Sequence, residues 1–299
     1  MPTRRASTKQ ASYPAATIGI IGGSGLYNLE GLENVQEIDV KTPFGQPSDT
    51  IVTGSLHGQS IAFIPRHGRG HQLSPTEIPA RANIYALKSL GVQFLISISA
   101  VGSLREELRP MDLVIPDQLI DRTKSRINTF FDQALVAHVA FAEPFCPTLR
   151  KVLFQKASDV AKRVTDGGTY VVMEGPLFST KAESSLYKSW GASIIGMTAL
   201  PEAKLAREAE ICYATIACVT DYDCWHETEE SVTVEMVVAN LLGNIATSRE
   251  ILESAIPAIQ KSRDCVCATA LENAIITAKT HISTKAKRDL AVLIGKYVK

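Results

Sequence analysis

Two carboxylates stand two residues apart at the point where an apolar stretch of the chain ends. Asp221 and Asp223 follow residues 211–219, which are largely apolar and bounded by charged residues. This composition predicts a buried strand of an α/β sheet. If the chain stays extended, alternation puts both carboxylates on one face. Ligands of α/β proteins bind at the carboxyl edge of the sheet, so the pair is a candidate acid site, with a solvated strand-to-loop corner as the alternative.

A glycine-rich turn after the first apolar strand has the composition of an anion site. Gly22, Gly23 and Gly25 surround Ser24. They let the backbone curl so that N–H groups and the hydroxyl face an anion. The spacing does not match the G-x-G-x-x-G of a dinucleotide site, because its third position falls on Asn28. The turn therefore fits a single phosphate better than a pyrophosphate.

Cationic and hydroxyl groups follow two further predicted strands. Residues 61–65 run directly into Arg66 and His67, and a second apolar strand ends at Ser99 and Ala100. Arginine grips a phosphate through two parallel N–H bonds, while a hydroxyl and a backbone N–H add further donors. We expect these residues to face the same anion as the glycine turn, with a basic surface loop as the alternative. The sequence contains no defensible Ser-His-Asp or Cys-His arrangement, which suggests that the bound anion is itself the reactant.

The overall composition narrows the classes of partner. The chain has 299 residues, and its 31 basic and 31 acidic side chains give a formal net charge of zero. This balance favours neither nucleic acid nor a membrane surface, and no apolar run has the length of a bilayer span. Residues 1–16 are basic and lack an apolar segment, which argues against a secretory signal. We interpret them as a disordered extension, with a mitochondrial presequence as the alternative.

Six cysteines predict reduced thiols rather than a metal centre. Cys212 and Cys218 lie in the apolar stretch before Asp221, where free cysteine behaves as a small hydrophobe. Cys265 and Cys267 form a C-x-C sequence without a matching second pair, so the spacing predicts no zinc site. The pattern is typical of a cytosolic chain.

Strand and helix patterns alternate along residues 17–299 and predict one α/β domain. Helices are expected over residues 80–90, from an N-cap at Thr148 to the glycines at 167 and 168, after a Thr180–Glu183 capping box, from Pro201, and from Thr233. We find no internal repeat, low-complexity segment or linker, so we expect a single domain.

Several of these segments together resemble the purine nucleoside phosphorylase family. The matching pieces are 20–25 (IIGGSG), 66–69 (RHGR), 102–106 (GSLRE), 142–146 (AEPFC), 174–176 (EGP), 197–198 (MT) and 220–225 (TDYDCW). The resemblance implies a mixed α/β fold with a distorted central sheet flanked by helices. It also implies a homotrimer with sites near the subunit interfaces, and cleavage of an N-glycosidic bond by inorganic phosphate, a co-substrate, with no cofactor.

The resemblance assigns roles to particular residues of this chain. Phosphate would be bound by Ser24, Arg66, His67, Ser99, Ala100 and Thr198. Met197 would lie along the ribose, Phe178 over the purine, and Asp221, Tyr222 and Asp223 at the base. Ser179, Val234 and Val237, with His138 from a neighbouring subunit and Leu293, would set substrate choice or line the pocket for the 5′ substituent. Ser24 and Ser99 replace the threonines usual in the family, and both keep the hydroxyl.

The acidic pair favours adenine as the leaving base. A protonated carboxyl donates to N7 and accepts from the 6-amino group, whereas a 6-oxopurine would be served better by an amide. A like charge nearby and partial burial raise the pKa of such an acid, and we assign this role to Asp221, although a close pair titrates together. The valines at 234 and 237 favour a 5′-thioether, as in 5′-methylthioadenosine.

Three other functions remain as alternatives. A 6-oxopurine nucleoside phosphorylase would be at odds with the acidic pair, and a hydrolytic nucleosidase would leave the anion site unexplained. A non-catalytic nucleotide-binding module would bind adenine nucleotides without turnover. We expect a cytoplasmic enzyme, with the nucleus as a further location, and no nucleic-acid or membrane partner.

Overall fold

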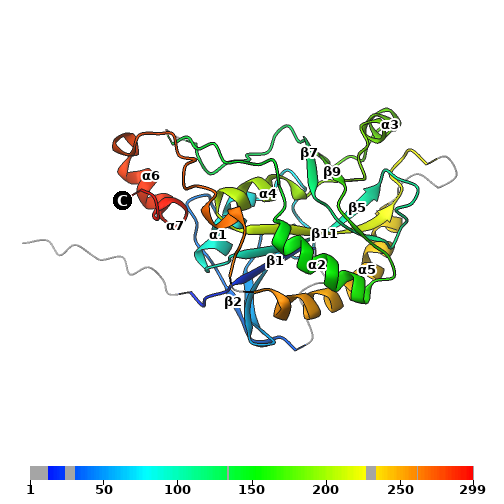
Figure 1. The fold of residues 1–299 in the computed structure, drawn as a ribbon, viewed down its shortest axis with the longest axis horizontal. Coiled ribbons are helices and arrows are strands. Elements are labelled where there is room, and N and C mark those ends of the chain that lie inside the picture. The colour runs from blue at the N-terminus through cyan, green and yellow to red at the C-terminus, as the bar shows by residue number, and fades with distance from the viewer. Residues whose placement is uncertain (1–12, 24–30, 133–134, 227–233, 261, 299) are drawn as a thin grey trace, which may run out of the picture.

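A computed structural model describes residues 13–23, 31–132, 135–226, 234–260 and 262–298, and within them eleven strands form one mixed sheet (Figure 1). Its main path runs in the order β2 (Glu33–Ile38), β3 (Ile51–Leu56), β4 (Gln59–Pro65), β1 (Ile18–Gly22), β5 (Phe94–Ser103), β10 (Ile194–Gly196), β9 (Thr169–Met173) and β7 (Gln118–Arg122). A branch carries β11 (Cys212–Asp221), β6 (Leu113–Ile115) and β8 (Val164–Asp166).

The sheet divides at β5. This strand pairs in parallel with β1 on one side and with β11 on the other, and its last residues, Gly102 and Ser103, pair antiparallel with β10. One strand therefore has three neighbours, which splits the sheet at its carboxyl end. The mixed, distorted sheet expected from the family resemblance is confirmed.

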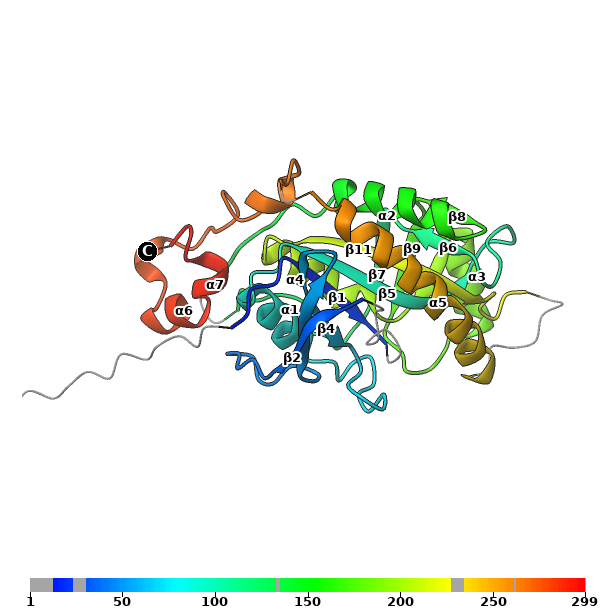
Figure 2. The same cartoon turned by 90° about the horizontal axis from the view of Figure 1, so that it is seen from below.

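Helices cover both faces of the sheet. The helices α1 (Ala80–Ser89) and α4 (Ala199–Glu208) pack into one buried cluster, and α2 (Pro147–Val160) and α5 (Val234–Ala258) pack into the other. The pair α2 and α5 lies side by side across one face (Figure 2). The single α/β domain predicted from the alternating patterns is confirmed.

The burial of β11 explains why the sequence before Asp221 is almost continuously apolar. All ten of its residues are buried. Cys212 and Ile216 enter the cluster with α2 and α5, while Tyr213 and Val219 enter the cluster with α1 and α4. Because helices cover both faces, neither face of the strand needs polar side chains.

The structure changes three expected boundaries. Helix α2 begins at Pro147, with Cys146 as its N-cap in place of Thr148, because proline fits the first helical position. It ends at Val160, and Val164 instead begins the strand β8. At the amino end, Ala16 is buried and its N–H donates to Leu90. The packed body thus begins before Thr17, while residues 1–12 of the expected extension lie outside the described residues.

Of the remaining helices, α3 lies between β9 and β10, and the others follow the last strand. The predicted capping box of α3 (Lys181–Ser189) is confirmed, because Thr180 and Glu183 exchange hydrogen bonds. The carboxyl-terminal segment contains η1 (Val266–Thr269), η2 (Lys279–His281), α6 (Thr284–Asp289) and α7 (Ala291–Ile294), and it extends from one end of the body (Figure 1). In the described part of the chain, no helix has the length and apolar character of a membrane span.

Candidate functional site

The carboxyl end of β11 is distorted in a way that places Asp221. Along most of its length β11 pairs with β5 residue for residue, but Val219 is opposite Val101 and Asp221 is opposite Gly102, so Thr220 is an extra residue. Such a bulge bends the strand and redirects the side chains beyond it. The bulge thus redirects the chain just before Asp221. The predicted acidic pair lies at the carboxyl edge of the sheet, where β5 also ends.

The sequence predicted that Asp221 and Asp223 lie on one face of an extended strand, and this prediction was wrong. The backbone N–H of Asp223 donates to Asp221 Oδ1 at 2.8 Å, and Asp223 has a φ of 52°. Aspartate tolerates this left-handed conformation and hydrogen-bonds its own backbone two residues on. The chain turns for this reason, and the two carboxylates come together through the turn rather than through strand alternation.

Both carboxyl groups are buried at the sheet edge. Asp221 is 6% exposed and Asp223 is 7% exposed. Burial is the main cause that raises the pKa of each, and it outweighs the donors that favour the charged form, which for Asp221 include the Thr220 hydroxyl at 2.7 Å. Each carboxyl therefore keeps a proton to a higher pH than an exposed aspartate does.

Two asparagines of α5 hold the bulge, and sequence reasoning did not identify them. Asn240 Nδ2 donates to the carbonyl oxygen of Thr220 at 2.6 Å, and Asn244 Nδ2 donates to that of Val219 at 3.4 Å. Asn240 supplies a donor to the carbonyl of the bulged residue, whereas the Val219 carbonyl also accepts from the backbone N–H of Met111 at 2.9 Å. An asparagine every fourth residue on a mostly apolar helix was the available signal.

Two predicted phosphate ligands come from neighbouring segments, although Ser99 lies within β5, which runs on to Ser103 and does not end at Ser99 as predicted. Ser99 Oγ and Thr198 Oγ1 lie 2.8 Å apart, which brings together two residues that are 99 positions apart in the chain. Thr198 precedes the first residue of α4 and Ala100 follows Ser99 in β5. Ser24 lies outside the described residues.

Arg66 is buried, and most of its donors already have partners. Its Nε donates to Glu202 at 2.5 Å, its Nη2 donates to Ser97 Oγ at 2.7 Å and to Glu202 at 3.2 Å, and its Nη1 donates to the Ile98 carbonyl at 3.0 Å. The side chains of Arg66 and Glu202 are each 2% exposed. One Nη1 hydrogen remains for an anion, so Arg66 offers a single donor and a fixed charge in place of the expected two-pronged grip.

His67 sits beside this pair as a neutral imidazole. Its Nδ1 lies 2.8 Å from the carbonyl oxygen of Leu73, and since a carbonyl only accepts, Nδ1 carries the hydrogen. Burial, followed by the charge of Arg66, lowers the pKa of His67 to about 4. At neutral pH, Nε2 is therefore an acceptor. The ring stacks on His71 with 4.1 Å between centroids.

The residues expected around the nucleoside lie on three segments, after β9, after β10 and after β11. Met197 approaches Gly175 closely, because a Cβ on that glycine would lie 2.4 Å from the Met197 sulfur. Phe178 is 43% exposed, and Ser179 accepts from the Cys224 thiol through its carbonyl at 3.2 Å. Tyr222 donates to the carbonyl of Glu106 at 3.2 Å. The hydrogen bond between Cys224 and Ser179 thus joins the loop after β9 to the turn after β11.

Arg126 joins the segment after β9 to the segment after β10, and its only signal in the sequence was a polar, irregular stretch. Its Nη1 donates to the carbonyls of Met197 at 2.5 Å and Leu200 at 2.6 Å, and its Nη2 donates to the carbonyls of Met173 and Glu174. One guanidinium therefore fixes the backbone on both sides of the position expected for the ribose.

The structure does not show the four residues that were expected to line the 5′ pocket brought together in one place. Val234 and Val237 lie in the first turn of α5, and their side chains are outside the described residues. His138 is exposed, and its N–H donates to the Ala274 carbonyl. Leu293 is 4% exposed and packs into the core of its own chain, because α7 turns its apolar side toward α1.

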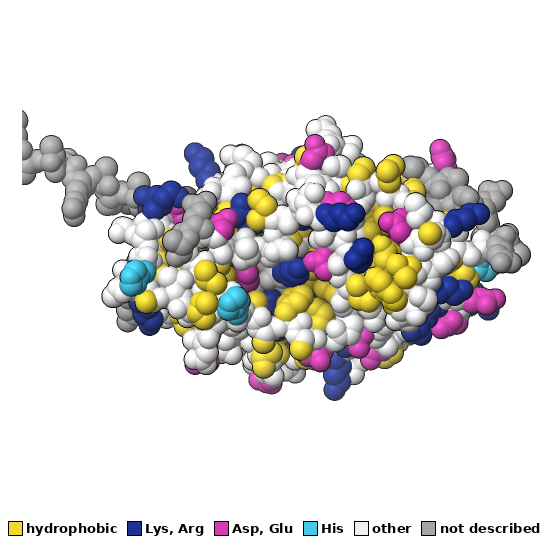
Figure 3. All heavy atoms as spheres, turned by 90° about the horizontal axis from the view of Figure 1, so that it is seen from above, with side chains coloured by type: hydrophobic (Ala, Val, Ile, Leu, Met, Phe, Trp, Pro, Cys, Tyr) yellow, Lys and Arg dark blue, Asp and Glu magenta, His cyan; other side chains and the backbone are white. Residues whose placement is uncertain are grey.

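A pocket of about 220 Å³ is lined in part by Arg126. Its lining includes Thr76, Arg81, Arg126 and Pro201, and none of its lining residues is an expected phosphate or nucleoside ligand. The residues predicted to bind phosphate and nucleoside therefore lie outside the lining of this pocket. Figure 3 shows one face with a central hollow where basic, acidic and hydrophobic side chains meet, and with both signs of charge interspersed around it.

Comparison with known proteins settles the family. A family model described as "Phosphorylase superfamily" matches residues 17–257. The chain belongs to the phosphorylase superfamily. The family resemblance noted in the sequence is thereby confirmed.

Relatives of this phosphorylase cover nearly its whole length. A protein of Koribacter versatilis and one of Geobacter sulfurreducens, both named S-methyl-5′-thioadenosine phosphorylase, are 56% and 55% identical to it, over 94% of this chain and 97% and 99% of theirs. A crystal structure of a methylthioadenosine phosphorylase from an antarctic soil metagenomic library matches with a TM-score of 0.90 and 48% identity, covering 94% of this chain and 99% of that one. A Schistosoma mansoni adenosine/methylthioadenosine phosphorylase mutant in complex with methylthioadenosine matches with a TM-score of 0.78 and 38% identity, covering 83% and 93%.

We predict that Glu202→Gln destabilises the phosphorylase by about 3–5 kcal/mol, because it leaves the buried Arg66 charge without its counter-charge. The matched control is Glu37→Gln, which breaks the exposed Arg69–Glu37 pair at 2.7 Å and should cost less than about 1 kcal/mol. Urea unfolding of both variants measures the two losses. Equal losses would mean that Arg66 does not depend on Glu202.

We predict that Asn240→Ala lowers the turnover of an adenine nucleoside with phosphate about tenfold, because the bulge that positions Asp221 loses its hydrogen bond to α5. The KM for phosphate should stay nearly unchanged, since the anion ligands come from other strands. The exposed Asn273→Ala is the control. A parallel loss of phosphate affinity would contradict a local role of Asn240 at the bulge.

Proposed function

We propose that this phosphorylase cleaves 5′-methylthioadenosine with inorganic phosphate and releases adenine and 5-methylthioribose 1-phosphate. The observation that carries the proposal is the meeting of two unlike groups at one sheet edge. The buried acids are Asp221, the last residue of β11, and Asp223, which follows it, while Ser99 of the Ser99–Thr198 hydroxyl pair belongs to the adjacent β5. The names of the relatives that share more than half of their residues with the chain support the substrate.

In the proposed reaction, phosphate is the nucleophile and no cofactor takes part. A phosphate oxygen forms a bond to C1′ as the C1′–N9 bond breaks, and the electron pair of that bond leaves with adenine. Positive charge develops on the ribose, so an anion held against C1′ both stabilises that charge and attacks it. The phosphate ligands we assign are Ser24, Arg66, His67, Ser99, Ala100 and Thr198.

His67 gives this anion site a preference for a protonated phosphate oxygen. Its Nδ1–H is committed to Leu73, so Nε2 accepts a hydrogen bond. Monohydrogen phosphate has one P–OH donor and two charged oxygens, which the hydroxyls and the remaining Arg66 donor can bind. The neutral imidazole therefore complements the arrangement of donors and acceptors on this ion.

Asp221 assists the departure of adenine as a general acid. A protonated carboxyl at this position donates to N7 of the base, which makes adenine a better leaving group. The Thr220 hydroxyl lies 2.7 Å from Asp221 Oδ2 and 3.2 Å from the carbonyl of Val101. It donates to Val101 while Asp221 holds its proton, and it turns to the carboxylate once the proton has left.

The remaining assignments concern substrate choice and assembly. We assign Met197 to the ribose, and Phe178, Tyr222 and Asp223 to the base. We assign the 5′ pocket and substrate choice to Ser179, Val234 and Val237, with His138 from a second subunit of a homotrimer. Leu293 is left out of this pocket because its side chain packs in the core of its own chain. An apolar pocket separates a thioether from a hydroxyl by a factor of roughly 10–200, so slower turnover of adenosine follows. The products belong to salvage of adenine and of the methylthioribose unit. The relatives from Koribacter versatilis and Geobacter sulfurreducens are bacterial, and they support a cytoplasmic rather than a nuclear location.

We predict that adenine is released from 5′-methylthioadenosine only when inorganic phosphate is present, with inosine left intact. Product analysis with and without phosphate measures this directly. Release in water alone would indicate a hydrolase and contradict the role of the anion site. Inosine cleaved as fast as 5′-methylthioadenosine would favour the 6-oxopurine phosphorylase, and binding without turnover would indicate a nucleotide-binding module.

We predict that Asp221→Asn lowers kcat for 6-aminopurine nucleosides by at least about a hundredfold, because the proton for N7 is lost. The affinity for phosphate should change far less. Burial raises the pKa of Asp221, so wild-type turnover should fall as the pH rises through that raised pKa, and this limb should disappear in the variant. The exposed Asp159→Asn is the control. Equal losses of turnover and phosphate affinity would contradict the acid role.

A further inference from the structure

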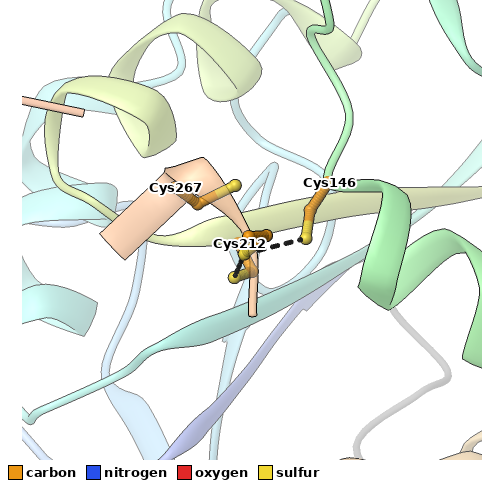
Figure 4. Close-up of side chains that lie close together, drawn as sticks. Cys146, Cys212 and Cys267 are labelled. Atoms are coloured by element: carbon orange, nitrogen blue, oxygen red, sulfur yellow. Dashed lines mark hydrogen bonds between the residues drawn. The ribbon is translucent and has the colours of Figure 1, made fainter. Parts of the chain in front are cut away.

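Four cysteines that are scattered along the sequence come together at one point. Cys146, Cys212, Cys265 and Cys267 place their sulfur atoms within 4.8 Å of one another. The Sγ atom of Cys265 lies 3.4 Å from that of Cys212 and 3.7 Å from that of Cys146. Figure 4 shows Cys146, Cys212 and Cys267 converging from the start of α2, the start of β11 and the helix η1.

The spacing of these sulfurs is that of ligands around a single ion. A zinc ion with Zn–S bonds of about 2.3 Å holds its four sulfurs about 3.8 Å apart in a tetrahedron. All four thiols are free, and the two Sγ–Sγ separations of Cys265 lie just below this distance, while all four sulfurs lie within 4.8 Å of one another. We propose that Cys146, Cys212, Cys265 and Cys267 form a tetrathiolate site for one structural zinc ion.

The surroundings of the cluster suit thiolates. Cys146 is the N-cap of α2, where the free N–H groups of the first turn stabilise a negative sulfur. Cys146, Cys212 and Cys267 are buried and Cys265 is half-buried. A closed set of four protein ligands leaves no position for water or substrate, so the site is structural rather than catalytic.

The location gives the ion a mechanical role. Cys265 and Cys267 begin the carboxyl-terminal segment, while Cys212 begins the central strand β11 and Cys146 begins α2. One ion would therefore fasten the segment that carries α6 and α7 to the sheet that carries Asp221. Binding a metal that the unfolded chain does not hold stabilises the folded state.

The sequence predicted no zinc site, because the closely spaced Cys265 and Cys267 are not matched by a second closely spaced pair of cysteines. The structure supplies the missing two ligands from single cysteines 53 and 119 residues away from Cys265. Spacing along the chain cannot reveal ligands that the fold brings together from separate elements.

The test compares two buried cysteines of the same strand. Cys212 and Cys218 are 0% and 1% exposed in β11, but Cys218 lies outside the cluster and contacts Ser248. Protein expressed with added zinc and dialysed should hold about one zinc per chain by elemental analysis. Cys212→Ala should lower this at least about tenfold, whereas Cys218→Ala should retain it. Cys265→Ser, at the half-buried ligand, repeats the comparison where Cys212→Ala fails to fold.

Two further measurements make the outcome decisive. Wild-type protein refilled with Co²⁺ should show the intense visible absorption of a tetrahedral thiolate complex, and Cys218→Ala should show it as well. A zinc chelator should lower the Tm of wild type and Cys218→Ala, but not of Cys265→Ser. Zinc-free wild-type protein with four free thiols would overturn the proposal. So would a disulfide between any two of these cysteines in freshly isolated protein, detected by mass spectrometry after alkylation without reductant.

Discussion

The burial of one positive charge constrains the centre of this molecule. Arg66 emerges from β4 into a position where its side chain is 2% exposed, and a guanidinium cannot be deprotonated to escape the cost of burial. Glu202 of α4 supplies the counter-charge, and Ser97 of β5 supplies a further acceptor. Tyr213 of β11 donates to the same glutamate at 3.0 Å. Three strands and a helix must therefore keep their positions for this charge to be tolerated.

This arrangement lets a cationic site and an acidic site share one sheet edge without neutralising each other. Arg66 already has a carboxylate partner, so Asp221 and Asp223 are not drawn to it. Their pKa values rise because burial outweighs the hydrogen bonds that would favour the charged form. A carboxyl group that keeps its proton can donate to a base, while the spare donors near Arg66 can bind an anion. Phosphorolysis of an adenine nucleoside requires both at once.

The same edge depends on irregular backbone that regular pairing would not provide. The bulge at Thr220 shifts the register of β11 against β5, and Asn240 and Asn244 of α5 donate to the carbonyls of Thr220 and Val219. Arg126 does the same for the loops that carry Met197 and Glu174. Buried carbonyls need donors. Irregular backbone next to the sheet therefore receives hydrogen bonds from polar side chains of other elements, as Asn240 and Arg126 show.

The sequence by itself determined the buried strand before Asp221, the single α/β domain, the α3 capping box and the family, because apolar periodicity, cap residues and short motifs are local. It also named Ser99 and Thr198, which the structure brings together. Only the tertiary structure decided that Arg66 pairs with Glu202, that a bulge rather than strand alternation joins the two aspartates, and that four separate cysteines meet. These outcomes depend on contacts between residues far apart in the chain, where side-chain spacing along the sequence carries no information about distance.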